Sequence, residues 1–141
     1  MAEARIFTLE EAERTLPLLR RILTDLKNEY RIWDDAQAEY ELLSSSSRAD
    51  SSESDALATA RRTFTDSADR ISGFLEEVHA VGCLFKGFDA GLVDFYTLRE
   101  DRLVFLCWRV DEEHITHWHE VEAGYAGRQP IDSTFLTTTL S

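Results

Sequence analysis

Residues 7–33 read FTLEEAERTLPLLRRILTDLKNEYRIW, a stretch in which apolar or aliphatic side chains recur at alternating spacings of three and four residues. This repeat is typical of a helix that packs one face along a second helix. Thr8 and Glu11 form the capping-box pattern that predicts a helix beginning near Leu9. The stripe positions are Leu9, Ala12, Leu16, Leu19, Leu23, Leu26, Tyr30 and Trp33.

Pro17 stands inside this stripe, where it lacks a backbone donor and crowds the preceding turn. We therefore expect a short helix at 9–15, a kink, and a long helix over about 17–43. Residues 44–55 are rich in serine and acidic residues and have no apolar repeat, so they predict a flexible loop.

A second stripe with the same spacing follows the loop and ends before Gly82, which suits a left-handed helix cap. Two comparable stripes joined by one loop predict a long antiparallel helical hairpin over residues 1–82. The second stripe consists of Leu57, Ala60, Phe64, Ser67, Ile71, Phe74, Val78 and Val81.

The pattern then changes to short runs rich in Val, Leu, Phe, Tyr and Trp, at 83–88, 92–98 and 102–110. Such runs, separated by turn residues, predict a three-stranded antiparallel meander. We expect a short C-terminal helix over 112–123, so that residues 83–131 form a β-meander plus helix. Residues 132–141 would form an irregular tail. The predicted fold class is α+β, as a single domain over 1–141.

Composition limits the function classes. Hydrophobic residues make up 43% of the chain, yet no run approaches the roughly 20 apolar residues of a membrane span. The net charge of −12 repels phosphate backbones, so we expect no autonomous nucleic-acid binding. The chain has two isolated cysteines and no secretory leader, and a cytoplasmic location is the simplest expectation.

Three of the four histidines fall in the segment 111–120, DEEHITHWHE, together with several carboxylates. On a helix, His119 would border the apolar stripe while His117 would face water, and Glu113, His117 and Glu120 would share a face. In an extended segment, His117 and His119 would instead point the same way. Either arrangement could begin a site for a divalent metal such as zinc, iron or manganese. The alternative is a hydrogen-bonded histidine beside a polar outer face.

Asp94 interrupts an apolar run, and a buried carboxylate needs a partner such as His119, Arg109 or Arg128. An Asp94–His119 pair could serve acid–base catalysis, although such pairs are more often structural. Cys107 could be a nucleophile with His119 as its base, but a buried structural cysteine is commoner. Asp94, Cys107 and His119 are thus weak catalytic candidates.

An ordered set of motifs resembles an uncharacterised bacterial family, domain of unknown function 2203. The set comprises Phe7-Thr8-Leu9-Glu10-Glu11-Ala12, Leu16-Pro17-Leu18-Leu19, Gly91-Leu92-Val93-Asp94-Phe95, Leu106-Cys107-Trp108, Trp118-His119, Gly124, Gly127 and Arg128. The resemblance implies no activity, substrate or cofactor. It draws attention to a possible common cluster of Asp94, Cys107, Trp108, Trp118, His119 and Arg128, which core packing explains equally well.

This chain departs from the family pattern at two dipeptides. Many members have Gly-Glu where it has Asp111-Glu112, and Asp-Gly where it has Glu100-Asp101. The second departure makes a tight two-residue hairpin less expected, because glycine adopts a positive φ more easily.

Two functions remain open. The first is a non-enzymatic interaction or scaffolding protein that acts through the helical hairpin, as a homo-oligomer or with protein partners. Its hairpin tip, with Asp50, Glu53 and Asp55, is a candidate partner-binding site. The second is a metal-binding protein, or a metal-dependent or acid–base enzyme, centred on 111–120 with His117, His119, Glu113 and Glu120 as candidate ligands.

Overall fold

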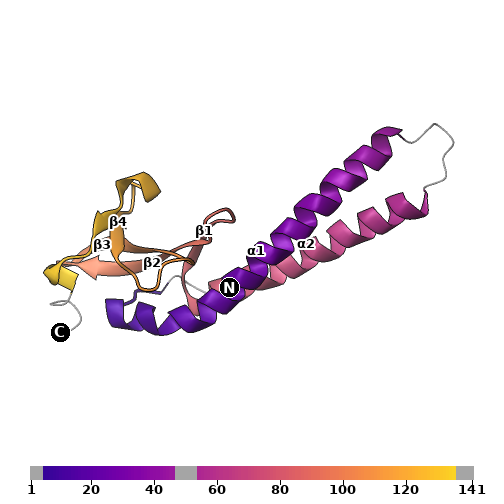
Figure 1. Cartoon of the computed structure of the whole chain (residues 1–141). Coiled ribbons are helices and arrows are strands. Elements are labelled where there is room, and N and C mark those ends of the chain that lie inside the picture. The colour runs from indigo at the N-terminus through magenta and orange to yellow at the C-terminus, as the bar shows by residue number, and fades with distance from the viewer. Residues whose placement is uncertain (1–4, 47–53, 136–141) are drawn as a thin grey trace.

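The structure of the protein is a computed structural model that describes residues 5–46 and 54–135. Two long helices are followed by a small antiparallel sheet, so the predicted α+β class is confirmed (Figure 1). In the part of the chain that the structure describes, no helix is both long enough and apolar enough to cross a membrane. The elements are α1 (Leu9–Ser46), α2 (Asp55–Val81), β1 (Leu84–Gly87), β2 (Leu92–Arg99), β3 (Arg102–Arg109), β4 (His117–Glu120), the 3₁₀ helix η1 (Tyr125–Gly127) and β5 (Gln129–Pro130).

The predicted capping box begins α1. The Thr8 backbone N–H donates to Glu11 Oε1 at 2.9 Å, and the Glu11 N–H donates to Thr8 Oγ1 at 3.0 Å. The predicted break at Pro17 is wrong, because α1 continues through this residue. Leu16 and Leu19, on either side of it, are buried in the core, and we attribute the continuity to their packing. The helix axis does bend in its early part (Figure 1).

Helix α2 is capped at both ends by side-chain and backbone chemistry. Ser54 Oγ accepts a hydrogen bond from the Leu57 N–H at 3.1 Å. Gly82 ends the helix at φ 106°, the left-handed conformation that its position predicts. The predicted loop 44–55 is too long at both ends, because α1 continues to Ser46 and α2 begins at Asp55.

The sheet has five strands in the order β1-β2-β3-β4-β5, and the three predicted strands are the first three. Strands β2 and β3 pair along their whole length, from Leu92 with Arg109 to Arg99 with Arg102. Their connection is a two-residue turn in which Glu100 and Asp101 adopt φ values of 52° and 66°. The tight hairpin therefore forms without a glycine in its turn.

The helix predicted over 112–123 is wrong: residues 117–120 form β4, and the preceding residues form a loop. Contacts from α1 hold this loop. Glu13 accepts a hydrogen bond from the Ile115 N–H at 2.7 Å, and Arg20 donates to the Glu112 and Glu113 carbonyls at 3.2 Å each. The backbone groups of Glu112, Glu113 and Ile115 thus form hydrogen bonds with side chains of α1 and not with the backbone of a local helix. Short helical turns do occur later, at η1 and at residues 133–135.

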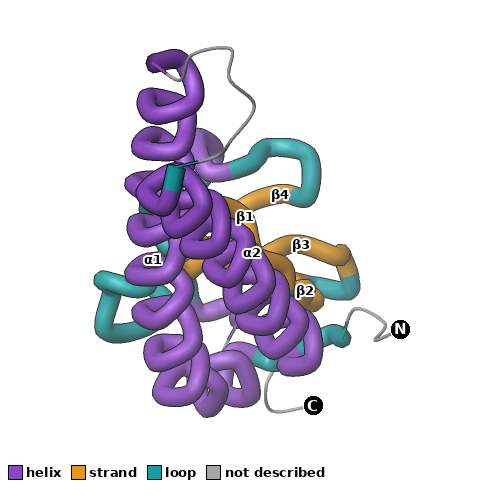
Figure 2. The backbone as a smooth tube through the Cα atoms, turned by 90° about the vertical axis from the view of Figure 1, so that its right-hand side faces the viewer, coloured by secondary structure: helices purple, strands orange, loops and turns teal. Residues whose placement is uncertain are grey.

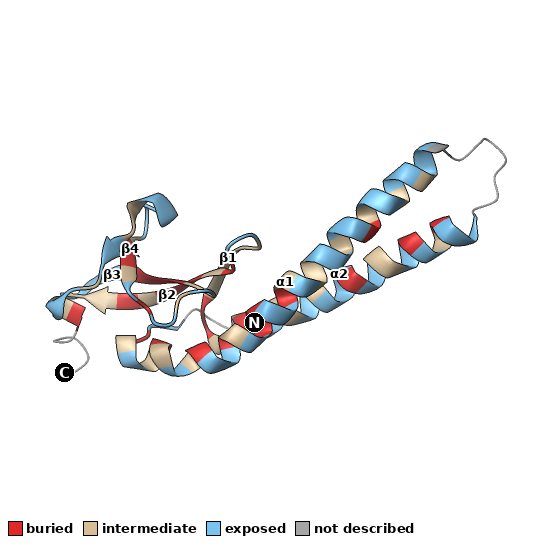
Figure 3. Cartoon of the chain, viewed as in Figure 1, coloured by how far each residue is buried: buried red, intermediate tan, exposed pale blue. Residues whose placement is uncertain are grey.

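The core lies between the helices and one face of the sheet, since both helices cover the same side (Figure 2). The root of α1 supplies Leu19, Leu23 and Leu26, and the strands supply Phe95 and Trp108. Beyond the sheet, the helices are mostly exposed, with only a thin line of buried positions between them (Figure 3). The helix pair thus has a buried root and a projecting arm.

Candidate functional site

The sheet face that points away from the helices carries three chemically reactive side chains on adjacent strands. Asp94 lies on β2, Cys107 on β3 and His119 on β4, and Asp94 is the direct cross-strand partner of Cys107. Their exposed fractions are 2%, 0% and 2%. One ligand-type atom from each lies within 4.8 Å of the others, the only such set of three or more His, Cys, Asp or Glu residues within 5–46 and 54–135. We call these three residues the sheet cluster.

Two oxygen atoms lie within hydrogen-bond distance of the ring nitrogens of His119. Its Nδ1 lies 2.8 Å from the Glu120 carbonyl oxygen, and its Nε2 lies 3.1 Å from Asp94 Oδ2. A carbonyl can only accept, so Nδ1 carries a proton. One further proton is shared between Nε2 and Oδ2, which leaves the pair neutral overall, whether it is an ion pair or two neutral groups.

Cys107 is a protonated thiol in this setting. Its pKa is raised to about 12, chiefly by burial and in addition by the charge of Asp94 and a side-chain hydrogen bond with it, while the guanidinium of Arg128 acts in the opposite direction. A thiol with that pKa is a poor nucleophile at neutral pH. The geometry therefore gives little support to Cys107 as an attacking group.

A second polar pair borders the sheet cluster. Arg128 donates to Glu112 Oε1 at 2.7 Å and to the Cys107 carbonyl at 3.0 Å. Burial alone would raise the pKa of Glu112, but the hydrogen bonds from Arg128 and from the Arg109 backbone outweigh it and lower the pKa. The sequence indicated Arg128 as a possible member of a common cluster, but it did not indicate Glu112. The only sequence feature that points to Glu112 is its position three residues after a buried strand.

Two charged side chains here are incompletely hydrogen-bonded. Asp94 Oδ1 and Arg128 Nε are buried without any hydrogen-bond partner, as is Arg99 Nε among the described residues. Buried polar atoms normally have a partner, because leaving one unpaired costs about 1–3 kcal/mol. Asp94 Oδ1 is thus a buried acceptor without a partner, and the Cys107 thiol interacts with the same carboxyl group.

The structure separates the other candidate metal ligands. The segment is extended, so His117 and His119 share a face, but His117 Nδ1 contacts Thr116 Oγ1 at 2.8 Å. Glu120 pairs with Arg102 at 2.8 Å, and the exposed Glu113 lies 3.9 Å from His114 Nε2. Among these four residues, only His119 belongs to the sheet cluster.

The remaining members of the predicted common cluster lie elsewhere. Trp108 and Trp118 occupy the opposite face of the sheet, in the helix-covered core. At the hairpin tip, Asp55 is the exposed first residue of α2, whereas Asp50 and Glu53 lie outside the described residues.

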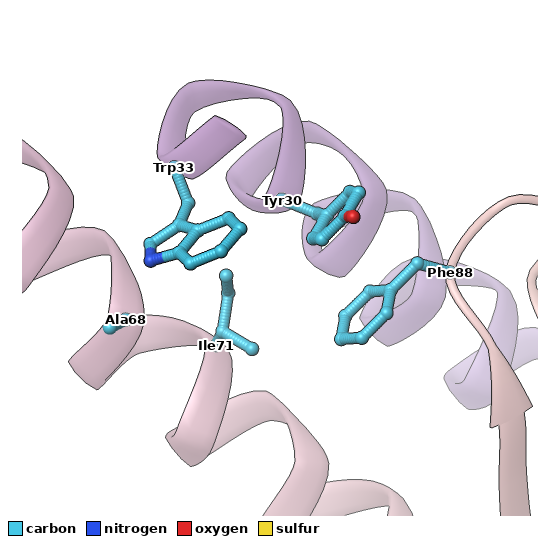
Figure 4. Close-up of a pocket in the computed structure, with 5 residues that line it drawn as sticks. All are labelled: Tyr30, Trp33, Ala68, Ile71 and Phe88. Atoms are coloured by element: carbon cyan, nitrogen blue, oxygen red, sulfur yellow. The ribbon is translucent and has the colours of Figure 1, made fainter. Parts of the chain in front are cut away.

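A hollow of about 270 Å³ lies where the arm leaves the sheet (Figure 4). The Tyr30 ring stacks on Phe88 of the β1–β2 turn with ring centroids 4.4 Å apart, and on Trp33 at 5.8 Å. Ala68 and Ile71 of α2 complete its lining. Half-buried aromatic surface of this kind is typical of binding surfaces.

Comparison with protein families gives one match. The model of the uncharacterized conserved protein family DUF2203 matches residues 5–131. The chain belongs to this family. No curated protein and no solved structure matches the chain. The DUF2203 match therefore adds no activity or ligand to the geometry described above.

Proposed function

We propose that this DUF2203 protein is a non-enzymatic interaction or scaffolding protein whose helical arm is the binding element. The single observation that supports this is the arm itself. Past Tyr30, residues 31–46 of α1 extend for about 24 Å, and they pack on α2 rather than on the sheet (Figure 1). This part of the helix pair does not pack on the core, so its outer surface is not required for the sheet to fold.

The arm also carries apolar surface. Ile32 and Leu42 have exposed fractions of 44% and 69%, and the aromatic hollow lies at its root. Exposed apolar groups on a helix favour contact with a second helix or a second copy of the chain. We therefore propose that the protein forms a homo-oligomer in the cytoplasm through this surface.

The rival function, a metal-dependent or acid–base enzyme, has less support. A substrate would have to reach groups whose exposed fractions are at most 2%. The thiol nearest to the imidazole is also held protonated by burial. Acid–base catalysis needs a group within hydrogen-bond reach of the substrate.

Site-specific photo-crosslinking tests the proposal. A photoreactive residue at Ile32 or Leu42 should give crosslinked species in cells. The same residue at Leu103 or Val121 on the sheet side, which are 41% and 43% exposed and so match Ile32 at 44%, should not. Repeating the reaction with purified protein separates self-association, which survives purification, from a different partner. Equal crosslinking from the two pairs of positions would contradict an arm-based function.

A further inference from the structure

We propose that Asp94, Cys107 and His119 bind one Zn²⁺ ion that cross-links β2, β3 and β4. This inference is independent of the arm and of its proposed partners. It gives the sheet cluster a structural role, because the residues are closed off from solvent. Structural zinc sites are likewise enclosed by protein, but they have four ligands, so a fourth donor such as a water molecule would complete the tetrahedron beside these three side chains.

The donor set matches the chemistry of zinc. Thiolate, imidazole and carboxylate are all zinc ligands, whereas Mg²⁺ and Ca²⁺ prefer oxygen alone. Metal–ligand bonds of about 2.0–2.3 Å in a tetrahedron place ligand atoms about 3.3–3.8 Å apart. In the sheet cluster, Nε2 and Oδ2 are 3.1 Å apart and all three ligand atoms lie within 4.8 Å. Side-chain adjustments on the order of 1 Å would therefore suffice.

The orientation of His119 supports the same ligand. A metal-binding histidine generally donates its second ring N–H to a carbonyl or carboxylate, which fixes the ring and the tautomer. His119 already does this through Nδ1 to the Glu120 carbonyl, and its Nε2 lies 3.1 Å from Asp94 Oδ2. The partnerless Asp94 Oδ1 adds a buried acceptor at the same place.

Charge balance also favours a divalent ion. Without metal, Asp94 and His119 share one proton and Cys107 keeps its own, so the three side chains are neutral together. Zn²⁺ would displace both protons into solvent, leaving a carboxylate, a thiolate and a neutral imidazole around the ion. The total charge remains zero, so no uncompensated charge is buried. The nearby Arg128–Glu112 pair keeps its own neutrality.

Cobalt titration of the full chain, expressed without a histidine tag and stripped of metal with a chelator, tests this assignment. Co²⁺ should bind one per chain, with a sulfur-to-cobalt charge-transfer band and the visible spectrum of a tetrahedral site. Zn²⁺ should then displace it and raise the Tm. Absence of any saturable spectral change in the wild-type protein would overturn the proposal whatever the variants do.

Variants identify the ligands. Cys107→Ser should abolish the charge-transfer band, and Asp94→Asn should weaken Co²⁺ affinity by about 100-fold or more, because even removal of groups behind metal ligands costs about 10- to 100-fold. Cys83→Ser is the matched control: Cys83 is another buried thiol with a pKa raised by burial to about 12, but it lies outside the sheet cluster. Loss of binding in His117→Gln but not in Cys107→Ser would assign the metal to the surface histidines instead.

Discussion

The carboxylate of Glu29, between the helices, and that of Asp94, on the outer face of the sheet, differ in how completely their oxygens are hydrogen-bonded. Between the helices, Glu29 accepts from Ser67 Oγ at 2.7 Å and pairs with Arg70 at 2.9 Å. Both oxygens of Glu29 are therefore paired, and its side chain keeps an exposed fraction of 12%. On the sheet, Asp94 is more deeply buried and one of its oxygens has no partner.

The difference separates a structural polar contact from a candidate ligand site. A polar group between two helices whose hydrogen bonds are all formed fixes the alignment of the helices at little cost in stability. A nearly inaccessible group with an unused acceptor costs stability as it stands. We infer that the helical group is complete in itself, whereas the sheet cluster is completed by a ligand.

The largest effect should follow removal of His119. His119→Ala leaves the Asp94 carboxyl group buried without a partner and opens a cavity, so we expect a loss of about 3–5 kcal/mol in the free energy of unfolding. Denaturant-induced unfolding of the metal-free protein measures this loss of stability. His117→Ala, on the same face of β4, should cost less than about 1 kcal/mol. Similar losses for both variants would erase the distinction between the buried and the peripheral histidine.

A smaller, pH-dependent effect should follow Glu29→Gln. Hydrogen bonds from Arg70 and Ser67 outweigh burial and hold the pKa of Glu29 below its ordinary value of 4.5. The stabilisation is therefore complete above about pH 4.5 and is lost as the pH falls through the lowered pKa. We expect a loss of about 1 kcal/mol at pH 7, and the difference from wild type should shrink in acid.

Unfolding curves at several pH values check the Glu29 prediction. Glu39→Gln, which changes an exposed glutamate of the same helix, serves as the control. A difference between Glu29→Gln and wild type that stayed constant down to acid pH would show that the seam does not depend on the charge of Glu29.

The smallest effect concerns the turn that aligns Asp94 with Cys107. Asp101 adopts φ 66°, where a side chain costs about 1 kcal/mol and glycine does not. Asp101→Gly should stabilise the protein by about 0.5 kcal/mol, since glycine's greater entropy in the unfolded chain offsets part of the gain. Thermal unfolding should show a higher Tm, while Asp101→Ala should lower it. A lower Tm for Asp101→Gly would indicate that the Asp101 side chain itself stabilises the turn.

Local patterns predicted the helices and the first three strands because the interactions that define them are close in sequence. The capping box joins Thr8 and Glu11, three residues apart, and the helix stop at Gly82 depends on one residue's conformational freedom. The prediction of a helix over 112–123 was wrong because the interactions that decide the structure of this segment are distant in sequence. Its helical periodicity is real, but Glu13 and Arg20, about 100 residues away in the chain, bind the loop and favour β4.

The sequence by itself determined the paired helical stripes, the strand-rich second half and the family of this protein. Those features follow from side-chain spacing and from contacts within a few residues. Only the tertiary structure decided that Asp94, Cys107 and His119 meet, because their juxtaposition requires three strands in one register. Register is set by which face of each strand the helices cover, and that depends on packing across the whole chain.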